Sequence, residues 1–400
     1  MKRGLALLFA AALLASGCSL FKSKDNIHPP KPVPKFARTM SVSELWSQGI
    51  GDGAGRSGVR LRPAVSAGIV YAASDNGSLA AWKLDSGATV WSHAFGGGWH
   101  PFGWFKGGRG QDRFTGGPSV ADGLLVVGTQ KGGVYAFEAK TGKELWRAQV
   151  SSEVISAPAI AGGRVFVRTN DGHVFALDGQ TGKQDWLYDR GDVPALSLRG
   201  NGTLLAVNGA LFFGADDGKL VALSQADGST LWQLPIATGE GRTDIQRLND
   251  ADGRVTFANG TLYVDAYHGN VMAVDPATGH ALWSRPLSSY TGVDEGAGKV
   301  VAVDDTSAIW ALDASNGGDL WKQDLLGWRW LSAPAVQMGK YIVVGDLQGY
   351  AYWLAIADGK LLAKERPAGS AIAARPLVVG DVVVLAGDDG SVTAYRVSGG

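Results

Sequence analysis

A glycine followed four residues later by a tryptophan recurs along this chain and constrains its fold more than any other feature. In one example, the alternating segment 174–178 leads into the turn Thr181-Gly182, and Trp186 follows. Intervals between successive turn glycines are 55, 40, 46, 51, 38, 42 and 41 residues. A repeat of about 40 residues with four short strands is typical of a β-propeller blade. The turn glycines are Gly87, Gly142, Gly182, Gly228, Gly279, Gly317, Gly359 and Gly400.

The last repeat is incomplete, and the start of the chain supplies what it lacks. It ends at Gly400, where its outermost strand should begin, whereas Ser43-Glu44-Leu45-Trp46 has the form of that strand. Pairing of the two ends would close the ring and remove open sheet edges. The sequence therefore predicts an all-β, eight-bladed propeller over 37–400, with four-stranded blades and closure by the strand around Trp46. We expect the repeat tryptophans to pack between blades: Trp46, Trp91, Trp146, Trp186, Trp232, Trp283 and Trp321.

The first 36 residues have the pattern of an export signal and an anchor. Positive residues, a short apolar run and small residues precede Cys18, so 1–17 is predicted to be a secretory signal peptide. The site resembles a bacterial lipobox, which implies a mature N-terminus at Cys18 carrying acyl chains, palmitate included. Because Ser19 rather than aspartate follows, the resemblance implies the periplasmic face of the outer membrane. Proline-rich 18–36 is expected to be an extended tether.

Composition excludes several classes of function. Lys+Arg and Asp+Glu both total 37, so the basic excess of a nucleic-acid-binding protein is absent. The single cysteine excludes an internal disulfide and a cysteine-based zinc cluster. The six histidines have no metal-ligand spacing, so we expect no bound metal. No nucleophile or nucleotide motif stands out, so we expect no enzyme activity and no cofactor, with membrane contact through the lipid only.

Three connections exceed the basic repeat length, at about 95–117, 190–203 and 237–255. Each follows a tryptophan strand, so all three are expected on one face of the ring, and the last two leave consecutive blades. Apolar anchors with paired charges favour a protein-binding surface. Another interpretation, compatible with the first, is that the charges pair with each other and hold the loops. The two adjacent loops contribute Leu196, Leu198, Arg199, Arg247, Asp250 and Asp252.

The phrase Ala-Leu-Asp-x-x-Thr-Gly-x-x-x-Trp resembles the repeat of pyrroloquinoline-quinone-type propellers. The short, lipidated, eight-bladed form is similar to the BamB lipoprotein family of the outer-membrane β-barrel assembly machinery. The matching segments are 196–200, 244–252, 324–326 with 332–334, and 345–350. The resemblance implies that Leu196, Leu198, Arg199, Asp250 and Asp252 contact a periplasmic POTRA domain of the barrel-forming subunit. It also implies a scaffold that aids folding and insertion of nascent outer-membrane proteins.

Two other functions remain open from the sequence. One is a pyrroloquinoline-quinone-dependent periplasmic oxidoreductase, although such dehydrogenases are much longer. The other is a periplasmic glycan-binding propeller that uses the aromatic residues of the 95–117 loop, which include Trp99, Phe102 and Trp104.

Overall fold

The computed structural model describes residues 28–54, 59, 61–95, 113–191, 202–237 and 253–398. The predicted signal peptide, 1–17, and Cys18 lie outside these ranges. All regular secondary structure within the described ranges is β-strand. These ranges contain no apolar helix of membrane-spanning length.

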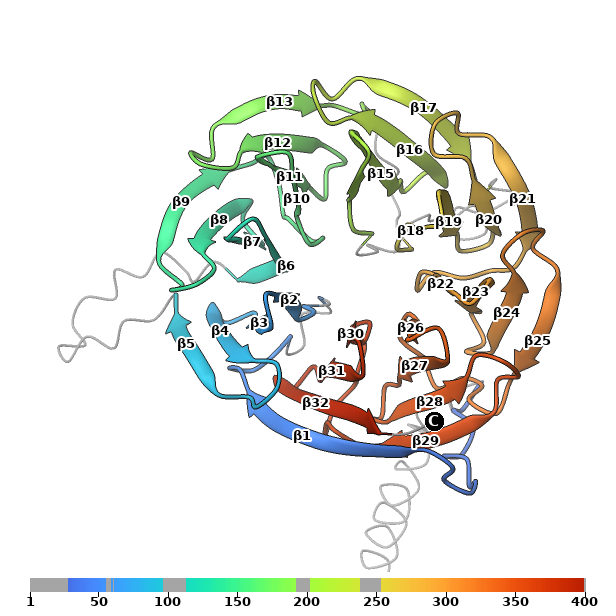
Figure 1. The fold of residues 1–400 in the computed structure, drawn as a ribbon. Helices are drawn as coiled ribbons and strands as arrows, with labels where there is room; N and C mark the ends of the chain where they lie inside the picture. The colour runs from blue at the N-terminus through green and yellow to red at the C-terminus, as the bar shows by residue number, and fades with distance from the viewer. Residues whose placement is uncertain are drawn as a thin grey trace, which may run out of the picture.

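The strands form eight four-stranded antiparallel sheets arranged around a ring (Figure 1). Each sheet is one blade, and its first strand lies nearest the centre while its last strand lies at the perimeter. The predicted eight-bladed propeller is therefore confirmed. From centre to perimeter, blades 1 to 4 contain β2 (Ala64–Ser66), β3 (Ile69–Ala73), β4 (Ser78–Lys83), β5 (Thr89–Ala94); β6 (Phe114–Ala121), β7 (Leu124–Thr129), β8 (Gly133–Glu138), β9 (Glu144–Gln149); β10 (Ala159–Ala161), β11 (Arg164–Arg168), β12 (Val174–Asp178), β13 (Gln184–Tyr188); and β14 (Leu205–Val207), β15 (Ala210–Gly214), β16 (Lys219–Ser224), β17 (Thr230–Pro235).

The remaining blades follow the same order, and the last one uses both ends of the chain. Blades 5 to 8 contain β18 (Thr256–Ala258), β19 (Thr261–Asp265), β20 (Asn270–Val274), β21 (Ala281–Pro286); β22 (Asp294–Gly296), β23 (Lys299–Val303), β24 (Ile309–Asp313), β25 (Asp319–Gln323); β26 (Ala335–Gln337), β27 (Tyr341–Gly345), β28 (Ala351–Ala355), β29 (Leu361–Glu365); and β30 (Leu377–Val379), β31 (Val382–Ala386), β32 (Ser391–Ser398), β1 (Ser41–Gly49).

Ring closure occurs where the sequence predicts it. The N-terminal strand β1 pairs antiparallel with β32, from Ser41 opposite Ser398 to Gly49 opposite Ser391, and it includes Trp46. In Figure 1 the two strands lie side by side along the perimeter. The first and last parts of the sequence thus share one sheet.

The core is a ring of apolar clusters, one between each pair of neighbouring blades. Between blades 3 and 4, for example, Phe166 and Val174 pack with Leu211 and Phe213, and all four are fully or almost fully buried. Middle strands are apolar on both sides because each blade is covered on both faces by its neighbours. This explains why β11 is buried from its second residue onward.

The tryptophans connect each blade to the next. The indole of Trp146 donates a hydrogen bond to the carbonyl of Gly179 at 2.8 Å, and its ring lies over Gly182. A Cβ added at Gly182 would be 2.4 Å from that ring, and φ there is +71°, so the turn requires glycine. Equivalent indole bonds, between 2.8 and 3.1 Å, run from Trp46, Trp91, Trp186, Trp232, Trp283 and Trp321 to the next blade.

The seventh blade has Ala363 in place of the tryptophan, and the ring closure explains the exception. A repeat tryptophan covers the last turn of the following blade, but blade 8 has no such turn because its outer strand comes from the N-terminus. A large aromatic side chain is instead present on the neighbouring strand towards the centre, β28. Trp353 lies opposite Ala363, is fully buried, and packs edge-on against Tyr395 of blade 8, with ring centroids 5.8 Å apart.

The segment before β1 lies against the outside of blade 7. Lys31 donates its backbone N–H to the Gly327 carbonyl at 3.0 Å, and the Lys364 ammonium donates to the Pro34 carbonyl at 2.8 Å. Further along, the Thr39 N–H donates to the Leu362 carbonyl at 3.0 Å. This segment therefore covers part of the outer edge of β29 before the chain enters β1.

Candidate partner-binding face

Strand direction decides which connections share a face of the ring. Because the strands of each blade alternate in direction, the chain leaves a blade on the same side as the turn between its second and third strands. We call this side the connecting face. The described ends of the three long connections that the sequence analysis singled out lie on this side. Residues 96–112, 192–201 and 238–252 lie outside the described part of the chain, and with them lie all five predicted partner-binding residues: Leu196, Leu198, Arg199, Asp250 and Asp252.

The start of the first partner loop is held by charges. The Asp189 carboxylate accepts the N–H of Gly191 at 2.8 Å. The neighbouring Arg190 forms an ion pair with Asp217, 3.0 Å between Nη2 and Oδ2. Asp217 belongs to the turn between β15 and β16 of blade 4, and Lys219 contacts the same carboxylate oxygen at 3.0 Å. The chain therefore enters residues 192–201 from an anchor on blade 4.

The second partner loop starts from the same turn. The N–H groups of Ile236 and Ala237 both donate to the carbonyl of Gly218, at 2.8 and 3.0 Å. Gly218 follows Asp217, which anchors the first loop. Both predicted partner loops thus begin on one turn of blade 4, although 46 residues separate the tryptophans that precede them.

A buried ion pair fixes that turn to the preceding blade. Arg168 at the end of β11 contacts Asp216 with 2.5 Å between Nη2 and Oδ1, and it donates to the Gly214 carbonyl at 2.9 Å. The two charged side chains are only 7% and 9% exposed. Separating two buried charges would leave each of them unpaired and would cost free energy. The contact therefore holds the turn in one position.

A buried carboxylate marks the end of the second loop. Oδ2 of Asp265 accepts hydrogen bonds from the Ser289 hydroxyl at 2.5 Å and from the Gly292 N–H at 3.0 Å. Burial raises the pKa of Asp265 to about 6, against the lowering effect of these bonds. Oδ1 faces Gly253, where an added Cβ would lie 1.9 Å away. The chain therefore returns from 238–252 past a carboxyl group that leaves no room for a side chain at 253.

Blades 6 and 7 contribute the other two segments that carry the family resemblance. Arg329 and Asp346 form an ion pair with 2.6 Å between Nη2 and Oδ2, and their side chains are 1% and 0% exposed. The same guanidinium donates to the carbonyl of Lys31 at 2.8 Å, so it also holds the segment before β1. Close by, Leu325 and Leu347 are about half exposed, at 51% and 47%. The sequence analysis did not single out Arg329, because its partners are distant along the chain.

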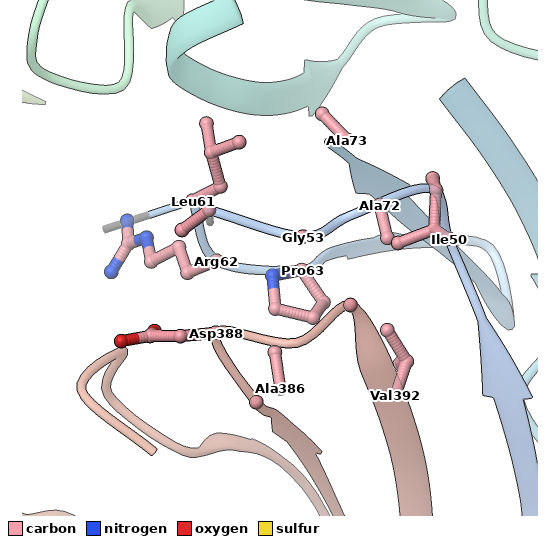
Figure 2. Close-up of a pocket in the computed structure, with 13 residues that line it drawn as sticks. Ile50, Gly53, Leu61, Arg62, Pro63, Ala72, Ala73, Ala386, Asp388 and Val392 are labelled. Carbon is pink, nitrogen blue, oxygen red and sulfur yellow. The ribbon is translucent and has the colours of Figure 1, made fainter. Parts of the chain in front are cut away.

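Several cavities lie near the start of the inner strands. One lies at the seam between blades 8 and 1 and has a volume of about 10 Å³, enough for a single water. Figure 2 shows Arg62 and Asp388 pointing to one side of this seam, away from Ala72 and Val392. Another cavity has a volume of about 500 Å³ and is lined by inner strands of several blades. Among the described residues, no group of three or more His, Cys, Asp or Glu side chains is arranged to hold a metal.

Comparison with known proteins gives the family. The model of the family described as outer membrane protein assembly factor BamB matches residues 103–323 and 306–400. The chain belongs to the BamB family. The outer membrane protein assembly factor BamB of Xanthomonas campestris pv. campestris is 41% identical over 407 residues, with 100% of this chain and 98% of that protein covered.

Solved structures agree with this assignment. The crystal structure of BamB from Moraxella catarrhalis has a TM-score of 0.78 at 26% identity and covers 89% of this chain and 100% of that one. A quinohemoprotein alcohol dehydrogenase from Comamonas testosteroni has a TM-score of 0.68 at 15% identity, covering 89% and 76% of the two chains. At that identity the likeness shows the fold alone. The BamB family and the quinoprotein enzymes therefore share the eight-bladed ring.

Proposed function

We propose that the protein is a non-enzymatic assembly factor for outer-membrane β-barrel proteins that binds the POTRA region of the barrel-forming subunit. Membership of the BamB family supports the role in assembly. The main support for this docking site is that the residues just before 192–201 and just before 238–252 are both bonded to the Asp216–Gly218 turn. A common anchor allows two loops from different blades to contact one partner domain.

Within these loops, Leu196 and Leu198 are the proposed apolar contacts, and Arg199, Asp250 and Asp252 are the proposed charged contacts. Apolar anchors supply most of the affinity of such surfaces, whereas charged groups fix the orientation of the partner. The rigid ring below the loops is expected to hold them in place for docking.

Co-purification of the barrel-forming subunit from outer membranes tests this docking site. We expect Arg199→Glu and Asp250→Arg to reduce recovery at least about tenfold, because each places a charge opposite a like charge on the partner. Arg396→Glu is the control, since Arg396 pairs with Asp381 on blade 8, far from blade 4. Unchanged recovery with both loop variants would remove the proposed site.

We further propose that Cys18 carries the lipid that holds the protein at the periplasmic face of the outer membrane. Several acyl chains on one residue suffice for stable anchoring, because each buried CH₂ contributes about 0.8 kcal/mol. Cys18→Ala should therefore release the protein from the membrane fraction and abolish labelling with palmitate. Retention of the label would contradict the assignment.

Nascent barrel proteins are the proposed clients of the complex. The perimeter strands, such as β13 and β17, have one neighbour each in their sheets and leave the opposite edge free of further strands among the described residues. An extended client segment would pair with such an edge through main-chain hydrogen bonds. Crosslinking from position 187 or 231 to a stalled barrel precursor tests this pairing, and absence of any crosslink on the perimeter would oppose it.

The enzymatic alternative has a direct test. Titration with pyrroloquinoline quinone and calcium is expected to give no saturable binding and no alcohol oxidation. Saturable binding accompanied by dehydrogenase activity would overturn the scaffold proposal.

A further inference from the structure

The 500 Å³ cavity near the ring centre has the size of a small-molecule site. Its walls include the starts of inner strands from blades 1, 2, 3 and 8, where Pro63, Pro118, Pro158 and Pro376 stand. A smaller cavity of about 60 Å³ has three lining residues in common with the 500 Å³ cavity. The shared residues are Arg62, Arg254 and Arg375.

These three arginines come from three different blades. Each stands two residues before the first residue of an inner strand: Arg62 before β2, Arg254 before β18 and Arg375 before β30. They are the only charged residues that line either cavity within the described part of the chain. Gly292 makes room for Arg254, since a Cβ at Gly292 would lie 2.8 Å from the Arg254 backbone nitrogen. The ring geometry therefore gathers positive charge at its centre.

One of the three arginines has an acidic partner. Arg375 forms an ion pair with Asp294 and donates to the Pro334 carbonyl at 2.8 Å. Asp294 also accepts the N–H of Val336 at 2.7 Å, which fixes this carboxylate. Within the part of the chain that the structure describes, Arg62 and Arg254 form no hydrogen bond or ion pair, although the charge of Asp294 also acts on Arg254. The arginine cluster thus has more positive than negative charge.

Arg62 and Arg254 are partly buried beside the cavity. Burial and the neighbouring charge of Arg254 lower the pKa of Arg62 to about 10, and burial also lowers the pKa of Arg254 against the raising effect of Asp294. A guanidinium has five N–H donors in a fixed plane, and leaving them without acceptors in a poorly solvated site costs stability. A bound anion would offset the positive charge that the two side chains bring to the cavity.

We propose that the central cavity is a binding site for a small multivalent oxyanion, of phosphate or polycarboxylate chemistry, held between Arg62 and Arg254. Guanidinium groups bind such oxygens in pairs of parallel hydrogen bonds, which suits two arginines that approach from different blades. Arg375, already oriented by Asp294, supplies a third positive group at the edge of the site. Arg254 follows the last residue of the second partner loop by two positions, whereas Arg62 and Arg375 lie outside both loops.

Isothermal titration calorimetry of the wild-type protein with pyrophosphate and, separately, with citrate tests the proposal at constant ionic strength set by sodium chloride. We expect saturable binding of at least one of the two anions, and the comparison distinguishes phosphate from polycarboxylate chemistry. Arg62→Gln and Arg254→Gln should each weaken binding at least about tenfold, because a hydrogen bond to a charged group is lost. Arg396→Gln, at an exposed pair on blade 8, should leave it unchanged.

Thermal melting adds a readout that separates binding from folding. In chloride buffer, Arg62→Gln should melt no lower than the wild type, because an unpaired charge is removed. The anion should raise the melting temperature of the wild type and not that of Arg62→Gln. Absence of saturable heat with wild type overturns the proposal. Equal anion-dependent shifts in both proteins also overturn it, since they would reflect general salt stabilisation.

Discussion

Replacement of Asp265 by asparagine is expected to change how stability depends on pH. The Asp265 side chain is almost completely buried, and its pKa rises from the ordinary 3.8 to about 6. The folded protein therefore binds this proton more tightly than the unfolded chain does. Its contribution to stability is complete below pH 3.8 and is lost as the pH rises through about 6. The loss is about 3 kcal/mol, because one pKa unit corresponds to about 1.4 kcal/mol.

Asparagine keeps an oxygen that accepts from Ser289 and Gly292 but does not ionise. As the pH rises from about 4 to about 8, the free energy of unfolding of Asp265→Asn should increase by up to about 3 kcal/mol relative to that of the wild type. Urea denaturation followed by tryptophan fluorescence at several pH values measures the difference, and other titrating groups cancel in it. Asp381→Asn, about half exposed at its pair with Arg396, is the matched control and should show little change. A wild-type-minus-variant difference that stays constant over this range would refute the argument.

Three further changes test the packing. Trp186→Ala should cost about 3–5 kcal/mol in urea denaturation, whereas Leu187→Ala, at an exposed position of the same strand, should cost little. Gly228→Ala should lower the melting temperature, since φ is +74° and the added Cβ would lie 2.5 Å from the Trp186 ring; an unchanged melting temperature would contradict this contact. Arg329→Met should cost about 3–5 kcal/mol because Asp346 then stays buried and unpaired, and recovery of stability in a double variant with Asp346→Asn would identify the unpaired charge as the cause.

The sequence was sufficient to predict the fold because the contact that joins neighbouring blades is itself periodic. Trp146 contacts the turn at Gly182, and Trp186 contacts the turn at Gly228, so both partners recur with each repeat. The strand around Trp46 was predictable because it fits the place left open at the end of the last repeat. Ala363 appeared in the sequence as an exception, and only the ring closure explained it.

The site was less accessible to sequence analysis. The loops with Leu196 and Asp250 were predicted from unequal repeat lengths, but their common anchor on the Asp216–Gly218 turn required the structure. Arg62, Arg254 and Arg375 lie on three blades and form no local motif. Their only signal is an arginine two residues before the first residue of an inner strand, twice as Arg-Pro, and a single sequence does not show that these strands meet at one axis.

Under the proposed lipidation of Cys18, the segment that runs from His28 to β1 has a mechanical consequence. Tension on that end would load the stacking of His28 on Trp328 and then Lys31, which is held by the Gly327 carbonyl, the Arg329 guanidinium and an ion pair with Asp324 at 3.4 Å. The ladder between β1 and β32 lies beyond this anchor and beyond the bonds at Pro34 and Thr39, so it carries load only after all of these are released. The strand that closes the ring is thereby shielded from forces between the membrane and any partner bound to the connecting face.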